Sequence, residues 1–227
     1  MKILNTIALL LLSSALFAQE QTIKINMNTD KALLQRSMYA YAEFTKGVVH
    51  LKGNTTEEAR LNYSRLNDEM LFIGNKNDTL ALSNPETVEN VIIGTDVYFY
   101  LGGTFVKQLT AYPTVNLELK SRLKYIGMEK RGDGYGATSN ASSNESFTNV
   151  KNGTAPRLDP YANLTYTLSN TYYLYNGKNL VPATKKTFVK SFSKHEQEIE
   201  NYIKTQTINF EKQADVEKLL QYIVSLN

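Results

Sequence analysis

Residues 44–126 consist of short apolar segments separated by turn residues. The segments are rich in β-branched and aromatic side chains, as in residues 48–51, 70–73 and 88–93. Glycine, asparagine, aspartate and proline interrupt the chain between them at nearly regular intervals. Strand-sized units at such spacing are typical of an antiparallel meander that forms a barrel-like or sandwich-like sheet. The pattern therefore predicts a mainly β fold.

The composition changes in residues 127–160. Three glycines within five residues and a run of serine, asparagine and threonine leave few aliphatic side chains there. Such a segment cannot bury enough apolar surface to offset the entropy of ordering it, so we expect a long mobile loop. Strands are predicted again at 164–168 and 172–175, and the dipeptide at 176–177, Asn-Gly, favours a hairpin turn.

The C-terminal part of the chain has the apolar spacing of helices. Thr184 is placed to cap a helix over residues 185–191, and Ser193 with Glu196 has the spacing of a capping box. A last helix over residues 213–226 carries a narrow apolar stripe. We expect two to three helices, docked on the sheet or on each other.

The first 18 residues have the three parts of a secretory signal peptide. Lys2 gives a positive start, residues 7–12 an apolar centre, and small residues allow cleavage after Ala18 or Ala15. The apolar run is too short to cross a bilayer. We therefore expect a soluble, exported protein in the periplasm or outside the cell.

The predicted organisation follows from these segments. Residues 1–18 form the signal peptide, residues 19–183 a β-rich domain that contains the loop over 127–160, and residues 184–227 the docked helices. Strands followed by helices in this order indicate an α+β fold, mainly β.

Charge and cysteine content narrow the range of partners and sites. The formal net charge is +3 and no cluster of basic residues is evident along the sequence, so we expect no nucleic-acid partner. The absence of cysteine excludes disulfides, a thiolate nucleophile, a cysteine-bound metal and a cysteine-linked lipid anchor. No second apolar run has the length of a membrane span. An exported chain without disulfides favours a bacterial source.

Several short motifs follow one another along the chain: residues 41–48, 61–70, 78–80 and 91–94, Phe99, and residues 208–210. In this order they resemble a group of uncharacterised secreted proteins of Bacteroidetes. The resemblance covers most of the chain after the signal peptide. It implies a location in the bacterial envelope, and it brings no known activity with it.

The triplet Asp78-Thr79-Leu80 allows two interpretations. It is similar to the Asp-Ser/Thr-aliphatic acceptor of periplasmic O-glycosylation in that phylum, which makes Thr79 a candidate modified residue. It also fits an ordinary boundary between a turn and a strand.

Few residues are candidates for catalysis. The two histidines, His50 and His195, are far apart, and no G-x-S-x-G motif accompanies them. The acid pairs at residues 57–58 and 68–69 would point to opposite faces of a strand, or lie in turns as solvated charges. No short ligand spacing indicates a metal. We predict no catalytic residue, no cofactor and no metal.

Tyrosines gather in the last predicted hairpin. The chain has 15 tyrosines and no tryptophan. An exposed tyrosine ring combines an apolar face with a polar hydroxyl and could stack on a partner. Tyr166, Tyr172, Tyr173 and Tyr175 are the candidate interaction surface, on which a sugar or a protein could stack. In the alternative interpretation these rings form cross-strand pairs that stabilise the sheet.

These observations favour a non-catalytic protein of the cell envelope. Its expected partner is a protein or an envelope polymer, bound through the tyrosine-rich hairpin and the loop after Gly127. One alternative is a carrier that holds a small apolar ligand in a β-barrel cavity. The other is a hydrolase that uses His50 or an acid pair. No feature of the sequence indicates an oligomeric state.

Overall fold

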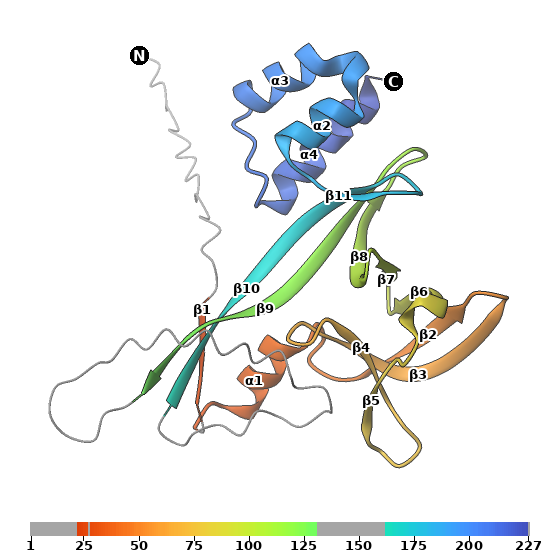
Figure 1. The fold of residues 1–227 in the computed structure, drawn as a ribbon, viewed down its shortest axis with the longest axis vertical. Helices are drawn as coiled ribbons and strands as arrows, with labels where there is room; N and C mark the ends of the chain where they lie inside the picture. The colour runs from red at the N-terminus through yellow and green to blue at the C-terminus, as the bar shows by residue number, and fades with distance from the viewer. Residues whose placement is uncertain (1–21, 27, 131–161, 227) are drawn as a thin grey trace, which may run out of the picture.

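The molecule is built on one antiparallel sheet with helices at its ends (Figure 1). The computed structural model describes residues 22–26, 28–130 and 162–226. Its strands are β1 (Thr22–Ile25), β2 (Thr45–Leu51), β3 (Thr55–Ser64), β4 (Glu69–Ile73), β5 (Thr79–Ala81), β6 (Val88–Ile93), β7 (Asp96–Leu101), β8 (Thr104–Ala111), β9 (Asn116–Lys130), β10 (Ala162–Tyr175) and β11 (Leu180–Pro182). Their order is β1-β10-β9-β8-β7-β6-β2-β3-β4-β5, with β11 paired to β10. The predicted fold, mainly antiparallel β with C-terminal helices, is confirmed.

The helices occupy two places on this sheet. The helical segments are α1 (Lys31–Met38), η1 (Pro85–Thr87), α2 (Lys185–Ser191), η2 (Ser193–His195), α3 (Glu196–Thr205) and α4 (Gln213–Ser225). Figure 1 shows α2, α3 and α4 grouped beyond one end of the long strands β9 and β10, and α1 beside β1 toward the other end. Among the described residues, no helix combines the length and apolar character needed to cross a bilayer.

One predicted helix start is confirmed and one is wrong. Thr184 caps α2, because its Oγ1 accepts a hydrogen bond from the Thr187 N–H at 3.3 Å. The capping box at Ser193 and Glu196 does not form: Ser193 lies in η2, and α3 begins at Glu196 without a side-chain cap. The 3₁₀ turn satisfies backbone groups at this junction, because the His195 N–H donates to the carbonyl of Phe192.

The sheet coils until β3 returns to β9. β9 pairs with β8 only over residues 116–119, and beyond them the Leu123 N–H donates to the Arg65 carbonyl at 2.9 Å. The Tyr63 hydroxyl also donates to the carbonyl of Ser121, at 3.2 Å. Strands β9, β8, β7, β6, β2 and β3 therefore form a roll, with β3 joined to β9 at these contacts.

The described residues form three apolar cores. The first lies between the C-terminal helices and the sheet, where Leu117 and Phe188 are fully buried. The second fills the roll around Leu61 and Val91, and the third joins β1, β9 and β10 around Leu123. Full burial of one such side chain contributes roughly 1.5–3 kcal/mol. The C-terminal helices thus dock on the sheet through a core of their own.

The long loop differs from its predicted bounds. The sequence predicts that it begins at Gly127, whereas β9 continues to Lys130 with a bulge in which Ile126 is the extra residue. Residues 131–160 lie outside the described residues, as do the signal peptide over 1–18 and its cleavage site after Ala18.

Candidate functional site

The tyrosines of the last hairpin do not form one surface. Tyr166 and Tyr172 are 7% and 6% exposed and belong to the apolar cores. Tyr173 and Tyr175 lie on the other face of β10 and are partly exposed. The part of this set that a partner can reach is therefore Tyr173 and Tyr175.

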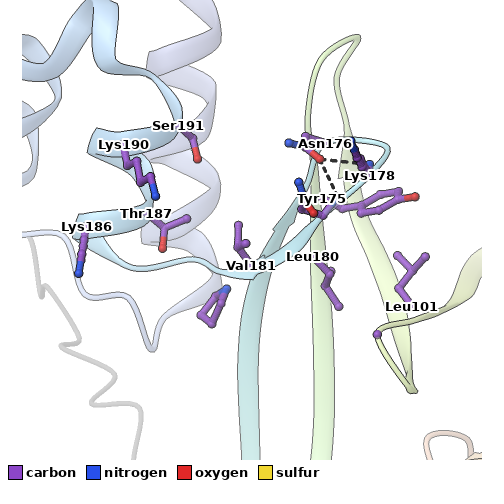
Figure 2. Close-up of a pocket in the computed structure, with 13 residues that line it drawn as sticks. Leu101, Tyr175, Asn176, Lys178, Leu180, Val181, Lys186, Thr187, Lys190 and Ser191 are labelled. Carbon is purple, nitrogen blue, oxygen red and sulfur yellow. Dashed lines mark hydrogen bonds between the residues drawn. The ribbon is translucent and has the colours of Figure 1, made fainter.

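A groove of about 750 Å³ extends around the β10–β11 hairpin, from α2 on one side to Leu101 and the Tyr175 ring on the other (Figure 2). Volumes of roughly 300–1,000 Å³ are typical of ligand sites. Tyr175, Leu180, Val181 and Pro182 come from the hairpin, and Leu101 adds an apolar side chain from the end of β7. We call this feature the lysine groove, because Lys178, Lys186 and Lys190 line it as well.

The three lysines carry the charge of the lysine groove. All are exposed, and no aspartate or glutamate is among the described residues that line the groove. Within the described part of the chain none of them forms an ion pair, whereas the neighbouring Lys185 binds Glu200 at 2.8 Å. Lys186 and Lys190 are four residues apart on α2, where like charges repel by roughly 0.2–0.5 kcal/mol. An anion in the groove would relieve this repulsion.

The hairpin wall of the groove is locked by its own hydrogen bonds. The Asn176 Oδ1 accepts from the N–H groups of Lys178 and Asn179 at 3.1 and 2.8 Å. Gly177 has φ +81°, the left-handed conformation that the predicted Asn-Gly turn requires. The Tyr175 hydroxyl donates to the Gly177 carbonyl at 2.9 Å, which restrains the ring. The wall therefore presents its tyrosine in one defined position.

A second polar group, around Asp68, has a structural role. The Asp68 carboxylate accepts hydrogen bonds from the Tyr63 hydroxyl and from the Thr104 hydroxyl, each at 2.7 Å. Lys120 Nζ lies 3.2 Å from it, and the Asp68 side chain is only 11% exposed. The prediction that the acid pair at 68–69 is solvated is therefore wrong for Asp68. This residue joins the β3–β4 turn to β8 and β9.

A smaller cavity of about 150 Å³ opens at the mouth of the roll, where both polar and apolar side chains line it. The Tyr41 hydroxyl donates to Asp96 Oδ2 at 2.6 Å and lies 3.1 Å from the Tyr98 hydroxyl. Burial raises the pKa of Tyr98 to about 12 and that of Tyr41 further, so both phenols stay protonated. Arg65 binds the backbone carbonyls of Arg36, Tyr39 and Ala40, and burial lowers its pKa. The cavity is smaller than the roughly 300–1,000 Å³ typical of ligand sites, and a purely apolar ligand would leave its polar groups without partners.

The other candidate residues lie apart from both cavities. His50 is half-buried in β2, where it pairs with Thr56 and Asn90, and His195 ends η2. Residues 57–58 are exposed on β3. Nowhere in the described ranges do three His, Asp or Glu side chains gather as a metal site.

The candidate glycosylation site is accessible. Thr79 is the first residue of β5, the strand at the end of the sheet, and all three residues of β5 are exposed. Both interpretations of its triplet fit this position, since a turn precedes β5 directly.

The comparison with known proteins gives no match: no protein-family model, no curated protein and no solved structure resembles the chain significantly. The function must therefore be inferred from the residues of this chain.

The lysine groove was missed in the sequence, although a signal for it exists. Lys178, Lys186 and Lys190 are spread over 13 positions, so no compact basic cluster is visible. However, the sequence contains no acidic residue between Asp159 and Glu196. That long acid-free stretch marks a region of local positive charge that the near-neutral total conceals.

Proposed function

We propose that the protein is an exported, non-catalytic binding protein of the bacterial cell envelope, and that the lysine groove binds a negatively charged partner. The observation that carries this proposal is a groove lined by three lysines that form no ion pair within the described part of the chain, and by no acidic residue among those described. Complementary charge steers a partner to such a surface and selects its sign. The signal-peptide pattern of residues 1–18 supports export.

Several observations support binding rather than catalysis. The phenols at the mouth of the roll are held protonated by burial, so they cannot act as bases near neutral pH. The Asp68 carboxylate is occupied by Tyr63, Thr104 and Lys120. The lysine groove, in contrast, offers charge and apolar surface whose partners are not already present in the described chain.

The test measures binding of two labelled polyanions, polygalacturonate and poly-L-glutamate, to the mature protein at low salt. The groove variant changes Lys178, Lys186 and Lys190 to alanine, and the control variant changes Lys31, Lys46 and Lys76, which are exposed elsewhere. Each exposed charge contact contributes roughly 0.2–1 kcal/mol. Loss of three should therefore weaken binding by about threefold to a hundredfold.

The control variant should bind nearly as well as the wild type, because it loses the same net charge from surfaces outside the groove. Binding of neither polymer would contradict the proposal. So would an equal loss in the groove and control variants, since this would mean that net charge alone attracts the polymers.

A further inference from the structure

We propose that the chain has a second binding surface, on the outer face of β9 and β10, and that an acidic polysaccharide binds there. We call this surface the basic ladder, because three cations of β9 lie directly across from three hydroxyl side chains of β10: Lys120 from Thr171, Arg122 from Ser169 and Lys124 from Thr167. The inference rests on the proposed function, since it specifies the class of the negatively charged partner. It uses none of the residues of the lysine groove.

The helices leave the outer face of β9 and β10 uncovered. Leu117 and Leu174 pack against the C-terminal helices, and Leu123 packs with α1 in the third core. Successive side chains of a strand point to opposite faces of a sheet. The basic ladder therefore points away from the α-helices of the described chain, and its last cation, Lys124, is exposed.

Each rung of the basic ladder combines one cation with one hydroxyl group. Directly opposite residues have Cβ atoms roughly 4.5–5.5 Å apart, and the rungs repeat every two residues, roughly 6.4–6.8 Å along the strands. None of the three hydroxyl groups makes a hydrogen bond within the described part of the chain. That of Thr167 is also buried, so neither the protein nor solvent satisfies it. An acidic sugar matches such a rung, because it offers a carboxylate to the cation and hydroxyl groups to the side chain across from it.

Two of the three cations are available to a ligand. Lys120 is held by the Asp68 carboxylate at 3.2 Å, whereas Arg122 lies 3.9 Å from it with a side chain that is 40% exposed. Lys124 forms no ion pair within the described residues. Glu118, the next side chain on this face, is fully buried, so its carboxyl group does not reach the surface. The ladder therefore has an excess of positive charge, which attracts an acidic chain.

Other linear polyanions fit the basic ladder less well. An extended peptide joins a sheet through free backbone groups at an edge, whereas the ladder offers side chains on a face. Acidic peptide side chains have carboxylates without hydroxyl groups, so they would not match both sides of a rung. Single-stranded nucleic acids are bound by aromatic rings on which successive bases stack, and the six side chains of the ladder include no such ring.

β10 connects the basic ladder with the lysine groove. Thr171 is four residues before Tyr175, which lines the outer side of the groove, so the two are roughly 13 Å apart along the strand. One long chain can therefore contact both surfaces, and binding at one raises the effective concentration of the chain at the other. The groove should contribute more, because it offers three lysines and the ladder two available cations.

The first test measures binding of polygalacturonate to the mature wild-type protein and two double variants. The ladder variant changes Arg122 and Lys124 to glutamine, and the control variant changes Lys31 and Lys46, which are exposed elsewhere, to glutamine. Loss of the two ladder charges should weaken binding by about twofold to thirtyfold. The control variant should bind nearly as well as the wild type.

The second test removes hydroxyl groups and keeps every charge. Ser169→Ala combined with Thr171→Val should weaken binding of polygalacturonate by at least about fivefold and leave binding of poly-L-glutamate unchanged. The wild type should bind polygalacturonate more tightly than poly-L-glutamate or poly-dT at equal charge. Melting curves establish that each variant is folded.

The outcomes separate this inference from the proposed function. Wild-type binding by a folded ladder variant, or equal losses in the ladder and control variants, overturns the ladder and leaves the lysine groove in place. Tighter binding of poly-L-glutamate or poly-dT overturns the polysaccharide, as does unchanged binding of polygalacturonate by the hydroxyl variant. Binding of no polymer overturns both proposals.

Discussion

At the scale of the residue, Glu118 is the polar side chain most at odds with its surroundings. It is fully buried in β9, opposite Gln108 and Tyr173, and neither carboxyl oxygen has a hydrogen-bond partner of normal geometry. Burial raises its pKa to about 7, and the nearby amides of Asn116 and Gln108 offset only part of this shift. Near neutral pH the buried carboxyl group therefore changes its charge.

Glu118 should make stability depend on pH. Between pH 4.5 and about 7 the folded protein holds a proton that the unfolded chain has released. Below pH 4.5 the Glu118 carboxyl group is protonated in both states, and its stabilising contribution is fully present. As the pH rises from 4.5 through 7, the free energy of unfolding falls by about 3 kcal/mol in total. Glu118→Gln keeps the neutral form, so its advantage over the wild type should grow from pH 5 to pH 8 in urea unfolding. A difference that stays constant over this range would contradict the assignment, and Glu57→Gln is the exposed control.

At the scale of the element, local patterns predicted where chain segments begin and turn. The predictions of the Asn176-Gly177 turn and of the Thr184 cap were correct, because each feature depends only on residues a few positions apart. The capping box predicted at Ser193 was wrong, because Ser193 lies in η2, which leads directly into α3. The side of β10 that each tyrosine faces follows from alternation, but which face is buried depends on β9, β11 and the helices.

The two candidate caps give a matched pair of variants. Thr184→Ala removes the hydrogen bond to the Thr187 N–H and should lower the free energy of unfolding by about 1 kcal/mol. Ser193→Ala removes no cap and should change it by less than about 0.5 kcal/mol. Urea unfolding of both variants tests the assignment, and a larger loss for Ser193→Ala would show that the capping box forms after all.

At the scale of the whole molecule, the sequence predicted the class of fold but not that the sheet coils into a roll. The strand spacing indicates an antiparallel sheet, whereas the return of β3 to β9 joins Arg65 to Leu123, far apart in the chain. The lysine groove is non-local in the same sense, because Leu101 reaches it from β7. A single sequence does not specify such contacts, because they depend on how strongly the sheet coils.

Gly47 lies where β2 closely approaches β6, so a substitution there tests the packing of the roll. A Cβ at this position in β2 would lie 2.4 Å from the Ile92 carbonyl oxygen and 2.8 Å from Leu61 Cδ1. Gly47→Ala should therefore push β2 from β6 and lower the free energy of unfolding by about 1–3 kcal/mol. Gly127→Ala is the control, since nothing lies within 4 Å of the added atom. Equal stability of the two variants would contradict the close approach of β2 and β6.

The central claim, that the lysine groove is the binding site, is tested most directly by NMR during a titration with polygalacturonate. The largest shifts should fall on the side chains of Lys178, Lys186 and Lys190 and on the ring of Tyr175, and they should disappear at high salt. Shifts concentrated elsewhere, for example on Tyr41 and Tyr98 at the mouth of the roll, would contradict the claim.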